Sequence, residues 1–536
     1  MIRCRTLGPV SIDVDGQAPP PELLWRKHLA LLIYLARSPR RTRTREHLVG
    51  LLWPEKDERA ARHSLNEALR VLRRGLGGAA IDTSAGQIRL APGNPWLDVE
   101  ELETRAGLRD WSGAGALAGG EFMEGFALPD ASAFEDWLGG QRSHWRGRSL
   151  DALLAWADEL ERGGRVREAV EPAERALALD PGSDRAVRAV MRSRALSGDR
   201  GTALARYAAF TEQLRNLTGS APEAETERCA ERIRQERGQP AGRAAAGETE
   251  TARRAPLVGR SAELIRLVDL LHASAGASRA LLAIVEGEAG TGKSRLVDEV
   301  ASRARLDGAL VAGVRAVPAD RSEPHGGLMA LARGGLLDGR GVAAASGSAL
   351  ATFARDIAEW ADRFPAARDT EPGAPVASFV EILRACCEEQ PVVLSVDDAH
   401  HLDDASMLAL GRGLRDLAAA PLVVLLSVPP RSSSAPLEEL RARLGRDVDG
   451  AVVPLGPLPA EALGSLVRWA LPSYDGAAAE RLVRRLASDS AGLPLLAVEL
   501  LYAVAQGLDL GTVEGAWPEP LRTLSETLPG DLPDAV

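Results

Sequence analysis

The residues best suited to chemistry form a glycine-rich run, GEAGTGKS, at positions 287–294. Its glycines let backbone N–H groups turn inward around phosphates, Lys293 can reach the β- and γ-phosphates, and the hydroxyl of Ser294 can ligate magnesium. Arginine is the usual cation of this chain, so a lysine inside this run is not a product of composition. We predict that ATP and Mg²⁺ bind at Gly287, Glu288, Ala289, Gly290, Thr291, Gly292, Lys293, Ser294 and Arg295.

Two carboxylates follow about a hundred residues later, at the end of the apolar run PVVLSVDD, residues 391–398. Asp397 can hold Mg²⁺ through water, and Asp398 can orient the attacking water. Two acids after a strand are common by themselves, and their functional interpretation depends on the glycine-rich run upstream. We therefore predict Asp397 and Ser294 as metal ligands and Asp398 as the catalytic residue.

A third group is an arginine-rich helix predicted from about Asp57, its N-cap, to Leu76. At 100° per residue, one face gathers Ala61, Leu65, Ala68, Leu69, Leu72 and Leu76, and the opposite face gathers Arg59, Arg62, His63, Asn66, Arg70, Arg73 and Arg74. Arginine and asparagine match base edges in the major groove of DNA, which admits a helix. The alternative is an ordinary amphipathic helix with a solvated cationic face.

Local patterns predict the elements that position these groups. Residues 10–14 alternate like a strand, two further helices are expected around 26–37 and 45–53 (with Thr44 as cap), and IDTSAGQIRL forms a hairpin about the turn 84–86. From 98 to 235 the pattern is helical, with residue pairs such as Gly164 and Gly198 separated by 34 positions. This interval is typical of tetratricopeptide-like repeats, although a general helical bundle is the alternative.

The second half of the chain alternates strands and helices. Strands are expected at 280–286, from 309, at 391–398 and at 421–427, which predicts a doubly wound parallel α/β sheet with its ligand at the carboxyl ends of the strands. Between the halves, residues 237–255 have the composition of a linker.

Charge and composition narrow the class of protein. Residues 1–90 hold 16 of the 65 basic and 9 of the 75 acidic residues, so a chain of net charge -10 has a basic amino end. This asymmetry favours a local polyanion-binding module, with chance clustering as the alternative. The four cysteines have no metal or disulfide spacing and are expected in the core. No signal peptide or apolar run of roughly 20 residues occurs, so we expect a cytoplasmic protein that contacts no membrane.

The amino-terminal half resembles SARP-type (antibiotic-regulatory) transcriptional activators, through TLGPVSIDVDG, REHLVGLLWPEKDERAARHSLNEALRVLRRGL and the hairpin after them. The resemblance implies an OmpR-type winged helix-turn-helix at 1–95 and an all-α, tetratricopeptide-like bacterial transcriptional activation domain at 98–236. It also implies that Arg59, Arg62, His63 and Asn66 face base edges, and that Arg70, Arg73, Arg74, Arg43 and Arg89 face phosphates.

The carboxyl-terminal half resembles STAND-class ATPases, through PLVGRSAEL at 256–264 and AGLPLLAVELL at 491–501. The resemblance implies a P-loop ATPase domain at 256–450 and a helical lid with a C-terminal segment at 451–536. It places Val258, Gly259 and Arg260 against adenine and closes Gly492 and Pro494 over the nucleotide. Pro429 and Pro430 stand where this class usually has an arginine, and Arg431 comes late, which predicts at most a weak ATPase used as a switch.

Together these features predict a multidomain, ATP-binding transcriptional regulator, an activator of a biosynthetic gene cluster. We expect the nucleotide state, ATP or ADP, to gate DNA binding or oligomerisation. Expected partners are direct-repeat promoter sites on double-stranded DNA, RNA polymerase, and further copies of the chain on DNA. Two alternatives stay open: an ATP-driven remodelling ATPase recruited by its amino-terminal domain, and a scaffold in which ATP is structural.

Overall fold

The computed structural model describes residues 2–14, 16–84, 86–235, 255–431, 434–474 and 476–505. The predicted linker at 237–255, apart from its last residue, and the segment after 505 lie outside the described residues, as does Ala85 in the predicted turn. The chain divides into two compact units, one reaching Ala230 and the other starting at Glu231, with Arg162–Gly164 grouped with the second.

The first unit begins with a winged-helix arrangement. Its elements are β1 (Ile2–Arg5), β2 (Ser11–Val14), η1 (Pro21–Leu24), α1 (Arg26–Ala36), η2 (Pro39–Arg41), β3 (Thr42–Thr44), α2 (Arg45–Leu52), α3 (Glu58–Leu76), η3 (Gly78–Ala80), β4 (Ile81–Asp82), β5 (Gln87–Leu90) and β6 (Trp96–Leu97). One sheet has the order β2-β1-β6 and the other β3-β5-β4. The predicted caps are confirmed: the side chain of Thr44 accepts from the N–H of His47, and that of Asp57 from the N–H of Ala60.

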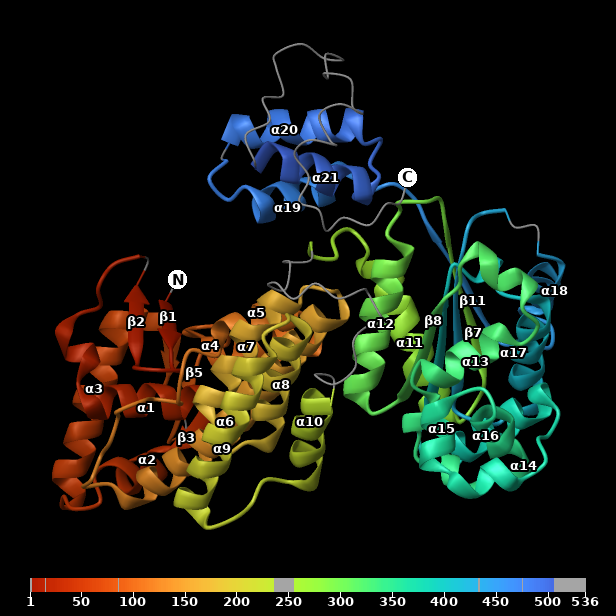
Figure 1. The fold of residues 1–536 in the computed structure, drawn as a ribbon. Helices are drawn as coiled ribbons and strands as arrows, with labels where there is room; N and C mark the ends of the chain where they lie inside the picture. Colours follow the sequence, from red (N-terminus) through yellow and green to blue (C-terminus); the bar gives the residue numbers. More distant parts are fainter. Residues whose placement is uncertain are drawn as a thin grey trace. The chain divides into compact units, whose positions relative to one another are not determined.

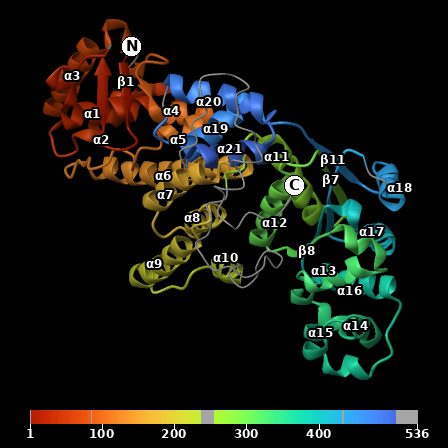
Figure 2. The same ribbon diagram turned by 45° about the horizontal axis from the view of Figure 1, so that its top comes forward.

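Helices complete the first unit: α4 (Asp98–Gly107), α5 (Trp111–Leu117), α6 (Ser132–Arg162), α7 (Val166–Leu179), α8 (Asp184–Leu196), α9 (Arg200–Thr218) and α10 (Ala224–Gln235). Figure 2 shows the long α6 beneath α1 and α2, and α7, α8 and α9 following one another beside it. Gly164 and Gly198 have positive φ angles directly before α7 and α9, and Ala169 and Ala203 are fully buried in those helices. Equivalent helices therefore recur at the predicted interval.

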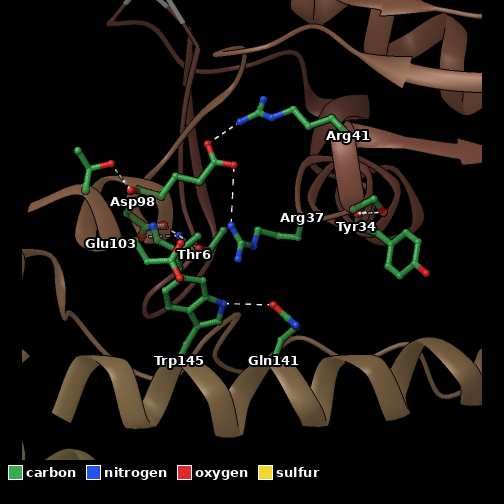
Figure 3. Close-up of polar contacts among 12 residues, drawn as sticks. Thr6, Tyr34, Arg37, Arg41, Asp98, Glu103, Gln141 and Trp145 are labelled. Atoms are coloured by element: carbon green, nitrogen blue, oxygen red, sulfur yellow. Dashed lines mark hydrogen bonds and ion pairs between the residues drawn. The ribbon is translucent and has the colours of Figure 1, made fainter. Parts of the chain in front are cut away.

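The winged helix and the helical region share one hydrophobic core, which runs from Ile2 to Ala186. The buried carboxylate of Asp98, at the start of α4, accepts hydrogen bonds from the backbone N–H and hydroxyl of Thr6 (2.7 and 2.6 Å) and from the N–H of Leu7 (2.8 Å). Arg37 and Arg41 both reach Glu100, and the guanidinium of Arg37 also lies over the ring of Trp145 on α6 (Figure 3). The two domains predicted at 1–95 and 98–236 therefore form one compact unit.

The second unit contains a five-stranded, all-parallel sheet in the order β11-β7-β10-β9-β8. The strands are β7 (Leu281–Gly287), β8 (Leu310–Arg315), β9 (Val392–Asp397), β10 (Leu422–Val428) and β11 (Gly450–Leu455). Alternate strand residues enter two cores. One core is formed with α11 (Ser261–Ala277) and α12 (Lys293–Asp307), and the other with α13 (Gly326–Arg333), α16 (Pro375–Glu389) and α17 (Asp404–Asp416). Figure 1 shows these helices around the sheet. The predicted doubly wound α/β sheet is thus confirmed.

Shorter helices complete this unit: η4 (Pro318–Ser322), η5 (Leu336–Asp338), η6 (Val342–Ala344), α14 (Gly347–Ala354), α15 (Ala358–Arg363), η7 (Pro365–Asp369), η8 (Ala399–His401) and α18 (Ala435–Arg443). A three-helix lid follows, made of α19 (Ala460–Ala470), α20 (Gly476–Asp489) and α21 (Pro494–Ala505), with its own apolar core. The boundary predicted after residue 450 falls inside β11, which pairs with β7, so the sheet extends to Leu455.

The four cysteines are buried, as their spacing predicted. Burial raises the pKa of Cys386 and of Cys387 to about 12, and it also raises the pKa of Cys4. Thiols in such surroundings stay protonated and behave as small apolar groups.

Candidate functional site

The glycine-rich run forms a tight loop between β7 and α12. Gly290 and Gly292 have φ angles of +78° and +90°, a region that side chains disfavour. A Cβ atom on Gly287 would lie 2.7 Å from Oγ1 of Thr291 and 2.8 Å from the carbonyl oxygen of Leu455. Each of these three glycines is therefore required by the backbone of the loop.

Lys293 is the first residue of α12 and its side chain is buried beneath the loop. Its Nζ donates to the carbonyl oxygens of Gly287 (2.9 Å) and Glu288 (3.1 Å). The helix N-terminus adds unpaired N–H groups and a partial positive charge, and Ser294 follows in its first turn. A lysine inside a glycine-lined loop at a helix N-terminus fits the phosphates of a nucleotide, and the adjacent hydroxyl fits its magnesium.

The two predicted acids lie at the carboxyl end of β9, separated from the strand of the loop by β10. Ser427, fully buried on β10, donates its hydroxyl proton to Oδ1 of Asp397 and accepts the N–H of Asp398 at 2.8 Å. Asp398 has a φ angle of +53°. One serine thus fixes the side chain of the first acid and the backbone of the second.

Arg315, the last residue of β8, reaches the same acids from the other side. Its Nε lies 3.4 Å from Oδ2 of Asp398 and 3.8 Å from Oδ2 of Asp397, although the arginine is 69% exposed. His400 follows the acids, and burial together with the nearby His401 lowers its pKa. His400 is therefore neutral at pH 7.

After β10 the chain continues through Pro429 and Pro430 to an exposed Arg431. Prolines therefore occupy the position directly after β10 at which STAND-class ATPases usually have an arginine. The polar side chain of β10 that contacts the acids is Ser427.

The lid contacts the loop directly. The N–H of Leu495, in the first turn of α21, donates to the carbonyl oxygen of Gly290 at 3.2 Å, and Pro494 lies near Gly292. Gly492 has a φ angle of +74°, and its carbonyl oxygen accepts the N–H of Leu458 at 2.7 Å. The predicted Gly-x-Pro segment therefore lies against the phosphate loop.

The residues predicted to lie against adenine are placed at the base of the lid. A Cβ atom on Gly259 would lie 2.6 Å from that of Ala462, and Val258 packs against the lid core. The side chain of Arg260 is buried and donates to the carbonyl oxygens of Thr291 (3.2 Å) and Gly456. The guanidinium of Arg260 therefore braces the phosphate loop against the segment after β11, which leads to the lid. The position of residues 258–260 against adenine stays a prediction.

Arg295, which was predicted as part of the nucleotide site, pairs through its guanidinium with Glu299 at 2.6 Å along α12. Sequence reasoning missed Ser427 and Arg315. Both stand at the carboxyl ends of parallel strands, where ligands of such sheets bind, and that signal could have found them.

The arginine-rich helix has the predicted faces. Its buried residues are the six predicted ones, Ala61, Leu65, Ala68, Leu69, Leu72 and Leu76. Arg59, Arg62, His63, Asn66, Arg70 and Arg74 are exposed on the other face. Arg62 pairs with Glu58 at 2.5 Å and Arg70 with Glu67 at 3.4 Å, both along the helix. A cationic surface therefore covers the side of α3 that faces away from the core.

The remaining predicted DNA contacts lie closer to the domain. Arg73 donates to Oγ1 of Thr83 at 2.7 Å and so ties α3 to the segment after β4. Arg43 donates to Oγ of Ser38 and lies over the ring of Tyr34, and Arg89 is exposed and donates to Thr42. Arg43 and Arg73 are thus partly engaged inside the fold. Arg45, which sequence reasoning did not single out, contacts the predicted base-reading residue Asn66.

Comparison with protein families identifies two domains in the chain. Residues 97–234 match the bacterial transcriptional activator domain, and residues 256–426 match an AAA ATPase domain. The first match covers the helices from α4 to α10, and the second covers the segment from α11 to most of β10, which includes the phosphate loop. No curated protein sequence matches the chain.

Solved structures with similar folds are distant. EmbR of Mycobacterium tuberculosis, in complex with a low-affinity phosphopeptide, is 22% identical, with a TM-score of 0.36 over 45% of this chain and 66% of EmbR. The RuvB Holliday junction branch migration motor of Thermotoga maritima is 20% identical, with a TM-score of 0.27 over 46% and 62%. Orc1 of Aeropyrum pernix, in complex with DNA, is 17% identical, with a TM-score of 0.30 over 47% and 60%. The chain spans less than two thirds of each of these proteins.

Within the described parts of the chain, no helix combines the length and apolar character that crossing a bilayer requires.

Proposed function

We propose that this chain, a SARP-type regulator that joins a bacterial transcriptional activator domain to an AAA ATPase domain, binds double-stranded DNA through α3 in a manner gated by its nucleotide. The observation that carries this proposal is the division of α3 into a fully apolar buried face and a cationic exposed face. A helix supported from behind by a core and lined with arginine in front is suited to the major groove.

In this proposal Arg59, Arg62, His63 and Asn66 read base edges. Phosphate contacts come from Arg70, Arg74 and Arg89, with Arg43 and Arg73 set back against the domain. The DNA sites are direct repeats in the promoter of a biosynthetic gene cluster, which the protein activates in the cytoplasm as an oligomer that recruits RNA polymerase. Phosphate contacts supply most of the affinity, and base contacts select the site.

The nucleotide site is proposed to hold Mg·ATP. Gly287 to Gly292 surround the phosphates with N–H groups, Lys293 contacts the β- and γ-phosphates, and Ser294 and Asp397 hold magnesium. The bound metal neutralises phosphate charge. Ser427 fixes the side chain of Asp397 and the backbone of Asp398, and the side chain of Asp398 orients the attacking water. Arg260 and the lid hold the conformation of the phosphate loop.

The lid contact supports the proposed gating, because α21 touches the same loop that would hold the phosphates. A nucleotide whose phosphates change the loop also changes the position that α21 can take. A typical coupling of about 1–3 kcal/mol would alter DNA occupancy by roughly 5- to 150-fold. We propose that this coupling controls DNA binding or oligomerisation.

The test is to incubate the full chain with fragmented genomic DNA from its host in Mg·ATP and in Mg·ADP at fixed salt, and to sequence the retained fragments. The proposal expects discrete fragments that contain repeats, retained differently in the two nucleotides. Uniform or absent retention in both conditions would refute it. Salt must be held constant, since phosphate contacts make binding strongly dependent on ionic strength.

A Lys293→Ala variant separates the two parts of the proposal. It removes the ammonium that would contact phosphates and leaves α3 unchanged. We expect it to bind the same fragments with no difference between ATP and ADP. A normal nucleotide response in this variant would contradict the switch.

The second candidate function is a scaffold in which ATP is a structural ligand. The observation that favours it is the pair Pro429 and Pro430 at the place of the expected arginine. A scaffold would show negligible hydrolysis and equal DNA retention in ATP and ADP. A remodelling ATPase would instead hydrolyse ATP rapidly without DNA and retain DNA independently of the nucleotide.

A further inference from the structure

We infer that Arg45 fixes the orientation of the Asn66 amide and thereby directs Asn66 to guanine instead of adenine. This inference rests on the proposed function, since it concerns which base the exposed face of α3 reads. It adds a residue outside the cationic face of α3 to the determinants of DNA specificity.

The contact itself is well defined chemically. Nη1 of Arg45 lies 2.9 Å from Oδ1 of Asn66. A guanidinium has five N–H donors and no acceptor, so the amide atom that faces it is the oxygen. The ambiguity between the nitrogen and oxygen of an asparagine amide therefore does not arise at this contact.

The backbone of Arg45 is held by the wing, the hairpin formed by β4 and β5. Arg45 is the first residue of α2 and follows Thr44, which pairs with Gln87 in the β3–β5 ladder. Its N–H donates to the carbonyl oxygen of Gly86 at 3.1 Å. The guanidinium thus starts from a fixed point at the junction of α2 and the wing, and it ends on α3.

The two glutamates of α3 pair with arginines of the same helix and not with Arg45. Glu58 pairs with Arg62, and Glu67 pairs with Arg70, along the helix itself. Arg45 is half-buried, whereas Asn66 is exposed. The amide is therefore held by its oxygen from the side of the domain, and its NH₂ group is left to face outward.

The chemistry of base edges then sets the preference. Adenine is read by asparagine through a pair of contacts, in which the amide oxygen accepts from N6 and the amide nitrogen donates to N7. In this protein the oxygen already accepts from Arg45, and an amino group approaching its other lone pair would meet a positive charge. Guanine presents two adjacent acceptors, N7 and O6. They can accept from the outward NH₂ group of Asn66, which lies beside the positive charge of Arg45.

The experiment selects binding sequences from a pool of randomised duplexes with the full-length protein. The Asn66→Ala variant identifies the position that depends on Asn66, because only there should the preference vanish. We expect guanine at that position for the unaltered chain. In Arg45→Met, which keeps an unbranched apolar stem but has no donor, the freed oxygen should shift the preference toward adenine.

The expected shift in the guanine-to-adenine ratio is about 5- to 150-fold, the range of a paired base contact worth about 1–3 kcal/mol. A double variant, Arg45→Met with Asn66→Ala, should show no preference at that position. Arg5→Met removes the same charge from an exposed site on β1 and serves as the control for net charge. It should leave the selected sequence unchanged.

The possible outcomes are distinguishable. Adenine at the Asn66-dependent position of the unaltered chain would overturn the inference, and so would an Arg45→Met variant that only weakens binding to all sequences. Loss of preference at a different position would mean that Arg45 reads a base itself, which also overturns it. If the unaltered chain selects no sequence at all, the proposed DNA-binding function fails, and this inference fails with it.

Discussion

At the scale of single residues, Ser427 connects the two acids of the nucleotide site. Its hydroxyl donates to Asp397 and accepts from the N–H of Asp398, and the side chain is fully buried. Replacing it by alanine leaves the partly buried N–H of Asp398 without this partner and frees the carboxylate of Asp397 to rotate. We expect Ser427→Ala to lower the free energy of unfolding by about 1–3 kcal/mol, which is measured by urea denaturation.

The same variant should weaken ATP binding by about tenfold in the presence of Mg²⁺ and leave binding in EDTA unchanged, since in the proposed site Asp397 acts only on the metal. Ser395→Ala is a matched control, because Ser395 is a buried serine on β9 two residues before Asp397. An equal loss of Mg²⁺-dependent affinity in both variants would show that Ser427 acts only through packing.

His400 makes stability depend on pH. Burial and the neighbouring His401 lower its pKa below the usual value of 6.5, so on acidification the unfolded chain takes up the proton first. The unaltered protein should therefore lose stability as pH falls below about 6.5, relative to a His400→Gln variant. Thermal unfolding of both proteins between pH 8 and pH 5 measures this difference.

His272 provides a control of opposite sign. The hydrogen bond that the His272 ring donates to the carboxylate of Asp307 raises the pKa of His272, so its stabilising effect is present at acidic pH and is lost as pH rises through the raised pKa. Relative to His272→Gln, the unaltered protein should gain stability on acidification. Differences of the same sign for both histidines would contradict this explanation.

At the scale of elements, local features were predictable from the sequence and remote contacts were not. The faces of α3 and its cap at Asp57 depend on residues within one or two turns, and both are as predicted. The contact of Ser427 with Asp397 depends on β10 lying beside β9, and strand order is set by the whole sheet. Arg260 is buried because the phosphate loop and β11 meet above it, which no local pattern encodes.

The junction between β1 and α4 is another contact that periodicity could not reveal. Asp98 accepts from Thr6 and Leu7, which are 92 and 91 residues away in the sequence, and joins the winged helix to the helical region. Asparagine in its place would present an NH₂ group to these donors. We expect Asp98→Asn to lower the free energy of unfolding of the first unit by about 1–3 kcal/mol.

Tryptophan fluorescence during urea denaturation can follow this unit, because of the ten tryptophans only Trp360, Trp469 and Trp517 come after residue 230. Asp136→Asn makes the same chemical change at an exposed position on α6 and should have little effect. If both variants lowered the free energy of unfolding equally, the contacts of Asp98 at the junction would not be the cause.

The contact between lid and loop gives a further prediction about elements. A Cβ atom on Gly492 would lie 2.9 Å from the carbonyl oxygen of Leu458 and 2.9 Å from Cβ of Pro457, at a φ angle of +74°. Gly492→Ala should therefore displace α21 from the phosphate loop. We expect release of a fluorescent ATP analogue, followed by stopped flow, to be about tenfold faster, which corresponds to about 1.4 kcal/mol of lost lid contact.

Gly445→Ala separates crowding from backbone strain. Gly445 has a similar φ angle of +77°, and a Cβ atom there meets nothing within 4 Å. Both variants pay the cost of a positive φ, about 1–3 kcal/mol, but only Gly492→Ala disturbs the lid. If the two variants released the ATP analogue at equal rates, displacement of the lid would not be the cause of faster release.

At the scale of the whole molecule, the shared core of the first unit restricts how a nucleotide signal can act. The core continues from the winged helix into α6, α7 and α8, and Asp98 and Glu100 bind the two regions together. Reorienting the winged helix alone would require opening this core and leaving the carboxylate of Asp98 without its donors. The nucleotide effect on DNA binding that we propose would therefore act on the first unit as one body, through its access to DNA or its pairing with another copy.

Such an effect must also be reciprocal, because coupling between two equilibrium binding sites has a single free energy. If Mg·ATP strengthens operator binding relative to Mg·ADP by some factor, the operator must raise the preference for ATP over ADP by the same factor. We expect this factor to lie at about 5- to 150-fold, measured by titrating fluorescent nucleotides with and without operator DNA. Asn66→Ala should reduce the effect of DNA on nucleotides, since it weakens binding at α3 without touching the loop. Unequal factors would mean that the nucleotide acts on DNA retention by hydrolysis or aggregation, and not by a coupled equilibrium.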